Sequence, residues 1–209
     1  MRSGGWSSKS RVEMHDPIRW KTGSHGSYGG AEHTAAATLN PPESSKCLVR
    51  AATAADMADV AAIYAKFVET STATFEITPP DEAEMQRRRQ ATLERGLPYL
   101  VAELEGYIVG FCYASQFRPR EGYRFTVEDS IYVRPDCIGH GVGRALLSEL
   151  IAECQAIGCH SMVACICGVN AVSEALHASL GFKQAGLLPE AGYKFGEWLR
   201  LLIMQRQLQ

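Results

Sequence analysis

The chain has 209 residues, of which 46% are hydrophobic, and its formal net charge at pH 7 is −2. That length predicts one folded domain with an additional segment. The near-neutral charge gives no general attraction to nucleic acid or to an acidic membrane, so neither partner is expected. No apolar run in the sequence has the length that a bilayer-spanning helix requires.

The N-terminal residues 1–46 differ in composition from the rest. They are rich in Gly, Ser, His and Thr and show no hydrophobic period, which predicts a mostly disordered extension. They also lack the apolar core of a secretory signal. The folded domain is expected over residues 47–209.

The first half of that domain is predicted to contain two helices and three strands. A short strand over residues 47–51 precedes a helix that Thr53 caps. A second helix runs from about residue 79 to 95, where Gly96 ends it. Residues 99–104 and 107–114 are apolar runs on either side of Glu105-Gly106, the pattern of a β-hairpin.

A third strand, residues 125–133, leads into a glycine-rich turn and a helix that begins near Gly143. The glycines let the backbone turn sharply and leave its N–H groups uncovered. These groups and the positive end of the helix dipole form an anion site, most naturally for a pyrophosphate. A strand over 161–166, a helix over 170–180, and last strands over 182–185 and 198–204 follow.

This order of elements predicts an α/β fold with a mixed, mostly antiparallel central sheet flanked by helices, because antiparallel strands come first and a strand–helix–strand unit comes later.

The glycine turn excludes two common nucleotide motifs. A Walker loop requires G-K-[ST], where this chain has Gly143-Arg144-Ala145. A dinucleotide fingerprint requires G-x-G-x-x-G, and the glycines here alternate instead. The [Q/R]-x-x-G-x-[G/A] loop of acetyl-CoA enzymes remains, with Ile138 in place of its polar first residue. A glycine-rich helix start without a ligand stays open as the alternative.

Seven cysteines occur, most of them within apolar patterns. The simplest interpretation is reduced core thiols in a cytoplasmic protein, and it covers Cys112, Cys154, Cys159, Cys165 and Cys167. One residue rather than two separates Cys165 from Cys167, and no histidine lies at zinc-ligand spacing, so no metal site is predicted.

Three further segments, residues 126–133, 170–182 and 192–199, make a family resemblance specific. Together with the glycine loop they resemble the phosphinothricin N-acetyltransferase branch of the GNAT superfamily, over roughly residues 48–207. The resemblance implies the GNAT fold and acetyl-CoA as co-substrate. It implies acetylation of the α-amino group of a small amino-acid-like compound such as phosphinothricin, methionine sulfoximine or methionine sulfone, and herbicide resistance as a consequence. A homodimer is a further expectation.

The resemblance and the chemistry together nominate two catalytic residues. The amine arrives as an ammonium, so a base must remove a proton, and Glu128, in the strand before the loop, occupies the position of the family's proposed base. His177 lies where many relatives carry a tyrosine thought to protonate the leaving thiolate. A surface carboxylate and a packing histidine are the alternative interpretations.

The resemblance also implies binding residues. Cofactor contacts are expected from the loop, from the strand before it and from the start of the later helix: Ile131, Tyr132, Val133, Ile138, Gly139, His140, Gly141, Val142, Gly143, Arg144, Asn170 and Ser173. Arg118 and Arg120 are expected to fork onto a substrate carboxylate. Phe75, Glu76 and Tyr123 are expected to shape the same pocket.

Alternative functions remain open on the sequence alone. One is acetylation of another amine, such as a protein N-terminus or a polyamine. Arg118 and Arg120 argue against a polyamine, which would require acidic residues. The other is a non-catalytic acyl-CoA-binding module, against which the presence of both Glu128 and His177 weighs.

Overall fold

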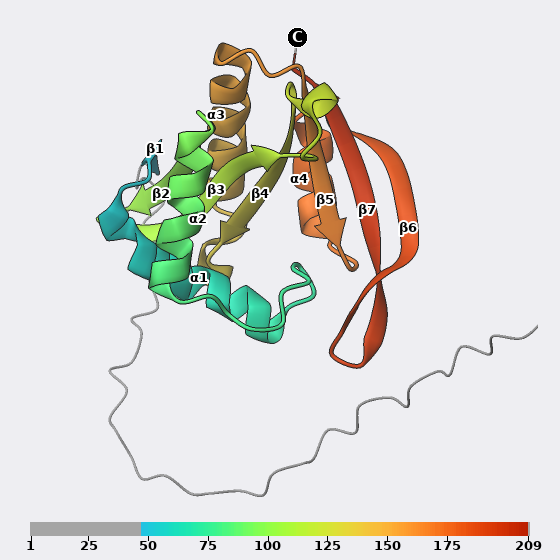
Figure 1. Ribbon diagram of the computed structural model, residues 1–209. Helices are drawn as coiled ribbons and strands as arrows, with labels where there is room; N and C mark the ends of the chain where they lie inside the picture. Colours follow the sequence, from blue (N-terminus) through green and yellow to red (C-terminus); the bar gives the residue numbers. More distant parts are fainter. Residues whose placement is uncertain (1–46, 209) are drawn as a thin grey trace, which may run out of the picture. The chain divides into compact units, whose positions relative to one another are not determined.

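The structure, a computed structural model, describes residues 47–208 (Figure 1), so the extension predicted for residues 1–46 lies outside the described residues. A seven-stranded sheet forms its centre, in the order β1-β2-β3-β4-β5-β7-β6. The strands are β1 (Leu48–Ala51), β2 (Tyr99–Leu104), β3 (Tyr107–Gln116), β4 (Thr126–Val133), β5 (Ser161–Cys167), β6 (Lys183–Lys194) and β7 (Glu197–Gln207).

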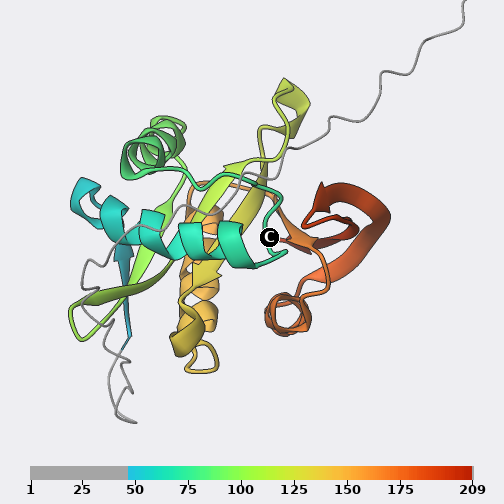
Figure 2. The same cartoon turned by 90° about the horizontal axis from the view of Figure 1, so that it is seen from below.

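Helices cover both faces of the sheet, as the views in Figures 1 and 2 show. They are α1 (Met57–Thr70), α2 (Glu82–Glu94), α3 (Val142–Ala156) and α4 (Ala171–Ser179). Within the described residues the neighbouring strands are antiparallel except for the parallel pair β4–β5. The predicted mixed, mostly antiparallel sheet flanked by helices is therefore confirmed.

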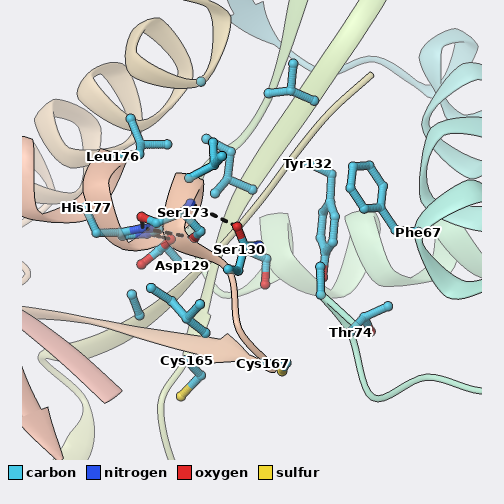
Figure 3. Close-up of a pocket in the computed structure, with 18 of the residues that line it drawn as sticks. Phe67, Thr74, Asp129, Ser130, Tyr132, Cys165, Cys167, Ser173, Leu176 and His177 are labelled. Carbon is cyan, nitrogen blue, oxygen red and sulfur yellow. Dashed lines mark hydrogen bonds and ion pairs between the residues drawn. The ribbon is translucent and has the colours of Figure 1, made fainter. Parts of the chain in front are cut away.

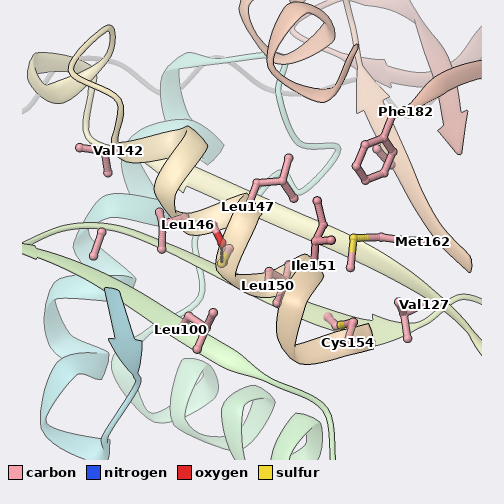
Figure 4. Close-up of a cluster of buried hydrophobic side chains, with 14 of the residues drawn as sticks. Leu100, Val127, Val142, Leu146, Leu147, Leu150, Ile151, Cys154, Met162 and Phe182 are labelled. Carbon is pink, nitrogen blue, oxygen red and sulfur yellow. Dashed lines mark hydrogen bonds between the residues drawn. The ribbon is translucent and has the colours of Figure 1, made fainter. Parts of the chain in front are cut away.

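The core divides into two clusters because successive side chains of a strand point to opposite faces. Leu100 of β2 packs with the Leu146, Leu147 and Leu150 row of α3 (Figure 4). Its neighbour Val101 packs on the other face with residues of α1 and α2. The buried stripe on α3 is the helical spacing that the sequence shows after the glycine turn.

The structure contains two long hairpins, of which the sequence predicted the one between β2 and β3. Glu105 and Gly106 take positive φ values of 54° and 83°, which suits the tight turn between β2 and β3. The second hairpin, β6–β7, is much longer than the strands predicted over 182–185 and 198–204. The pairing register of β6 shifts twice and most of its residues are exposed, so no hydrophobic alternation marks its length.

The parallel strands β4 and β5 diverge, and this opens the site. Their pairing begins at Thr126↔Ser161 and ends at Asp129↔Ala164. Beyond that point β4 continues on β3 as far as Val133, while β5 continues on β7 as far as Cys167. The facing backbone edges of residues 130–133 and 165–167 are therefore left out of the sheet's ladder.

None of the helices in the part of the chain that the structure describes combines the length and the apolar character needed to cross a membrane.

Candidate active site

A cavity of about 840 Å³ occupies the gap between β4 and β5. Its walls come from the diverging strand ends, the start of α3, the start of α4, and the residues 71–75 that follow α1, here called the wall segment. Figure 3 shows Asp129, Ser130 and Tyr132 of β4 spread across the view, with Cys165 and Cys167 of β5 below them. The cavity lining extends from the glycine loop to the two acidic residues in the first half of β4.

The glycine loop has the geometry of an anion cradle. Gly139 and Gly141 take left-handed φ values of 87° and 80°, which favour glycine, and a Cβ atom at either position would meet no atom within 4 Å. Gly141 is the N-cap of α3, and no side chain caps this helix. The first-turn N–H groups of Val142, Gly143 and Arg144 therefore keep their hydrogen-bonding capacity, and the helix dipole adds positive potential.

Most of the predicted cofactor residues line the cavity. These are Ile131, Tyr132, Val133, Ile138, Gly139, Gly141, Gly143, Arg144, Asn170 and Ser173. His140 is exposed, and the side chain of Val142 is buried in the core, so neither side chain lines the cavity. The Asn170 side chain accepts a hydrogen bond from the Ser173 N–H at 3.0 Å, which makes it the cap of α4 as well as a cavity residue.

Glu128 lies at the base of the gap and lines the cavity. Burial raises the pKa of its carboxyl group above the ordinary value, while the Cys165 thiol and the charge of Arg118 act in the opposite direction. Because Glu128 pairs with Val163 across the parallel ladder, Cys165 lies on the same face of the sheet. A carboxylate with a raised pKa is a better proton acceptor near neutral pH.

Asp129 and His177 form a buried pair on the opposite face of the sheet. The His177 Nε2 atom lies 3.0 Å from Asp129 Oδ2, and both side chains are 2% exposed. The other ring nitrogen, Nδ1, lies 2.8 Å from the carbonyl oxygen of Ser173. Since both partners are acceptors, an imidazolium beside a carboxylate satisfies both contacts.

The electrostatics of this pair favour the charged ring. Burial acts to lower the pKa of His177, but the hydrogen bond and the charge of Asp129 outweigh it, so the pKa lies above the ordinary value. His177 lines the cavity, and both of its ring nitrogens are held by protein atoms.

The predicted substrate residues separate into two groups. Arg118 and Phe75 line the cavity, whereas Glu76, Arg120 and Tyr123 do not. Glu76 accepts a hydrogen bond from Arg88 Nη1 at 2.6 Å. Arg120 is exposed, and the Tyr123 ring packs edge-on against Phe117 with the ring centroids 5.7 Å apart.

Several cavity residues were not predicted from the sequence. Asp129 stands next to Glu128 in β4, and its role depends on a histidine 48 positions later. Cys165 and Cys167 were interpreted as core thiols, but they are half-buried and line the cavity. That part of the thiol interpretation was wrong, because β4 leaves β5 after Ala164 and uncovers the end of the strand. Cys112, Cys154 and Cys159 are buried as expected.

Arg200 connects the last strand to its neighbours beside the cavity. It donates to the Gly168 carbonyl at 3.0 Å and forms an ion pair with Glu174 of α4. Arg200 therefore ties β7 to α4 beside the cavity. Among the described residues, no group of three or more His, Cys, Asp or Glu side chains has a metal-binding arrangement.

Comparison with known proteins defines the class. Residues 60–182 match the family model described as "Acetyltransferase (GNAT) family", and the chain belongs to this family. It is 48% identical to a phosphinothricin N-acetyltransferase of Alcaligenes faecalis, over 78% of this chain and 83% of that protein. It is 44% identical to an L-methionine sulfoximine/L-methionine sulfone acetyltransferase of Pseudomonas paraeruginosa, over 77% of this chain and 94% of that protein.

A solved structure supports the same assignment. The GNAT superfamily phosphinothricin acetyltransferase of Sinorhizobium meliloti, determined in complex with AcCoA, is 47% identical to this chain. The two structures superimpose with a TM-score of 0.76, and the match covers 77% of this chain and 88% of the Sinorhizobium meliloti chain. The resemblance predicted from the sequence motifs is therefore confirmed.

Proposed function

We propose that this protein transfers the acetyl group of acetyl-CoA to the α-amino group of a small amino-acid-like substrate of the phosphinothricin, methionine sulfoximine or methionine sulfone type. The observation that carries the proposal is the continuity of one cavity from the uncapped start of α3 to Glu128 through the gap between β4 and β5. The similarity to the three acetyltransferases supports the choice of substrate class.

The cavity residues fit acetyl-CoA, which would supply an activated acetyl group and a thiolate that leaves. The N–H groups at the start of α3 would hold its pyrophosphate. The unpaired backbone edges of residues 130–133 and 165–167 would hold its amide-containing arm, as an exposed sheet edge holds an extended peptide.

Two residues of the protein are proposed to carry out the proton transfers. Glu128 would take a proton from the ammonium, directly or through water, so that the nitrogen lone pair can form the N–C bond as the C–S bond breaks. His177 remains the proposed proton donor to the departing sulfur. Both of its ring nitrogens are engaged, so one of those bonds would have to open during the transfer.

The glycine loop gives the first test. Gly143→Val should weaken acetyl-CoA binding by roughly tenfold or more while the fold survives, because even a Cβ atom here would lie 3.2 Å from Leu176 Cδ2 and a branched side chain would crowd the anion cradle. Calorimetry measures the affinity, with Ser148→Val on the exposed side of α3 as the matched control. Unchanged affinity in the Gly143 variant would remove the pyrophosphate assignment from this loop.

Substrate choice gives the second test. Arg118 lines the cavity and forms no ion pair with any residue that the structure describes, so its guanidinium is proposed to receive the substrate carboxylate. Arg118→Ala should raise KM for the amino acid roughly tenfold, the scale of one hydrogen bond to a charged group, and leave KM for acetyl-CoA unchanged.

An assay of thiol release from acetyl-CoA measures these KM values, and two comparisons serve as its controls. Arg120→Ala is the matched variant, because Arg120 was predicted to share this role and lies outside the cavity lining. Decarboxylated analogues of the three substrates should react poorly. If they react as well as the amino acids do, acetylation of a broader set of amines replaces the amino-acid proposal.

Two further proposals concern the protein's surroundings. We propose a cytoplasmic location, which the seven free thiols of the described residues support. We also propose a homodimer, on the family resemblance, and resistance to phosphinothricin in cells that express the protein; sedimentation and growth assays test these two.

A further inference from the structure

Lys194 at the end of β6 is a buried cation with unusual partners. The residue is 2% exposed. Its Nζ atom donates to the carbonyl oxygens of Ser71 at 2.8 Å and Thr74 at 2.9 Å. No carboxylate among the described residues forms an ion pair with it. Burying an ammonium group is costly, and the two carbonyl contacts, together with the Phe195 ring centroid 4.9 Å from Nζ, offset that cost.

Both carbonyl groups belong to the wall segment, residues 71–75, which lies in neither a helix nor a strand and lines the cavity. Other contacts fasten the same segment from different elements. The Tyr64 hydroxyl of α1 bonds the Thr74 hydroxyl at 2.9 Å. A Cβ atom on Gly192 would lie 2.5 Å from the Phe75 ring, so only glycine lets β6 pack this closely.

The wall segment lies on the acceptor side of the cavity. It follows α1, which packs on the face of the sheet opposite α3. Glu128 points to that face, because its neighbour Asp129 points to α4 on the other one. The glycine loop, in contrast, precedes α3.

We propose that Lys194 is a positioning residue for the acceptor substrate: its ammonium group clamps the wall segment, and thereby Phe75, against the β6–β7 hairpin. This inference rests on the proposed acetyl transfer to an amino acid. Lys194 does not itself line the cavity. Its proposed effect on the acceptor pocket is therefore indirect and acts through the position of the wall segment.

Lys194→Met tests the clamp, because it keeps an unbranched stem and removes the charged donor. KM for methionine sulfone should rise roughly tenfold, on the scale of a lost charge-assisted hydrogen bond, with KM for acetyl-CoA unchanged. Lys183→Met, at the exposed other end of β6, is the matched control and should behave as wild type. Equal KM values for the amino acid in wild type and Lys194→Met would overturn the proposal.

A second pair of variants covers the case in which Lys194→Met fails to fold. Gly192→Ala should push the Phe75 ring and raise the same KM, whereas Gly186→Ala, whose Cβ atom would meet nothing within 4 Å, should not. An unchanged KM in Gly192→Ala would contradict the wall segment's role.

Hydrogen–deuterium exchange separates this proposal from the function on which it rests. Measured without substrate, the amides of residues 71–75 should exchange faster in the Lys194 and Gly192 variants than in their controls. If wild type turns over no amino acid, the proposed function fails, and exchange still decides whether the clamp exists. Equal exchange in the variants and controls would overturn the clamp even in an active enzyme.

Discussion

Glu128→Gln should lower kcat/KM for the amino acid by about 10²–10⁴ at neutral pH, the usual loss when a general base is removed. Glutamine keeps the shape of the side chain and cannot accept the proton. Binding of acetyl-CoA should change little, because the anion cradle at the start of α3 is formed by backbone groups of other residues.

The pH profile gives the sharper measurement. Burial raises the pKa of Glu128 above its ordinary value of about 4.3, so the acid limb of kcat/KM should lie above that pH and should be absent in the variant. Glu149→Gln, on the exposed side of α3, is the matched control. A near-wild-type rate in Glu128→Gln would reassign the base, with His177 as the next candidate.

Asp129→Ala should lower the free energy of unfolding by about 3–5 kcal/mol, because it leaves one member of a buried, hydrogen-bonded pair without its partner. Chemical denaturation measures this loss. Asp59→Ala removes an exposed carboxylate from the first turn of α1 and should cost only about 0.3–1 kcal/mol. Replacing Asp129 and His177 together by apolar residues should recover part of the loss.

The sign of the pH dependence follows from the direction of the shift. The pKa of His177 is raised in the folded protein, so the pair's contribution is fully present below the unfolded value of about 6.5 and is lost as pH rises through the folded value. The stability difference between wild type and Asp129→Ala should therefore be larger at pH 6 than at pH 9. A difference independent of pH would show that Asp129 does not raise the pKa of His177.

Local sequence patterns could predict the elements whose structure depends on neighbouring residues in the chain. The hairpin around Glu105-Gly106 has strands within two residues of the predicted bounds, since turn chemistry and alternation agree there. The helix after the glycine loop begins one residue before the predicted Gly143, since the turn and the apolar spacing mark its start.

What the sequence could not predict depends on contacts between distant segments. The Asp129–His177 pair requires α4 to pack beside the middle of β4. The placement of Arg118 on the cavity and of Arg120 away from it depends on a loop conformation that alternate arginines do not determine. Lys194 is an unremarkable residue in sequence, and its burial depends on the wall segment 120 residues earlier.

The divergence of β4 from β5 has a consequence for how such an enzyme can change over time. Contacts to a main-chain edge depend on the path of the strands and not on the identities of the side chains along them. The side chains of these residues can therefore serve the core, as those of Tyr132 and Ile166 do, while the backbone edges of residues 130–133 and 165–167 face the gap. On the proposed function, changes at Phe75 or Arg118, which line the cavity, could alter the acceptor without altering the backbone edges that are proposed to hold acetyl-CoA.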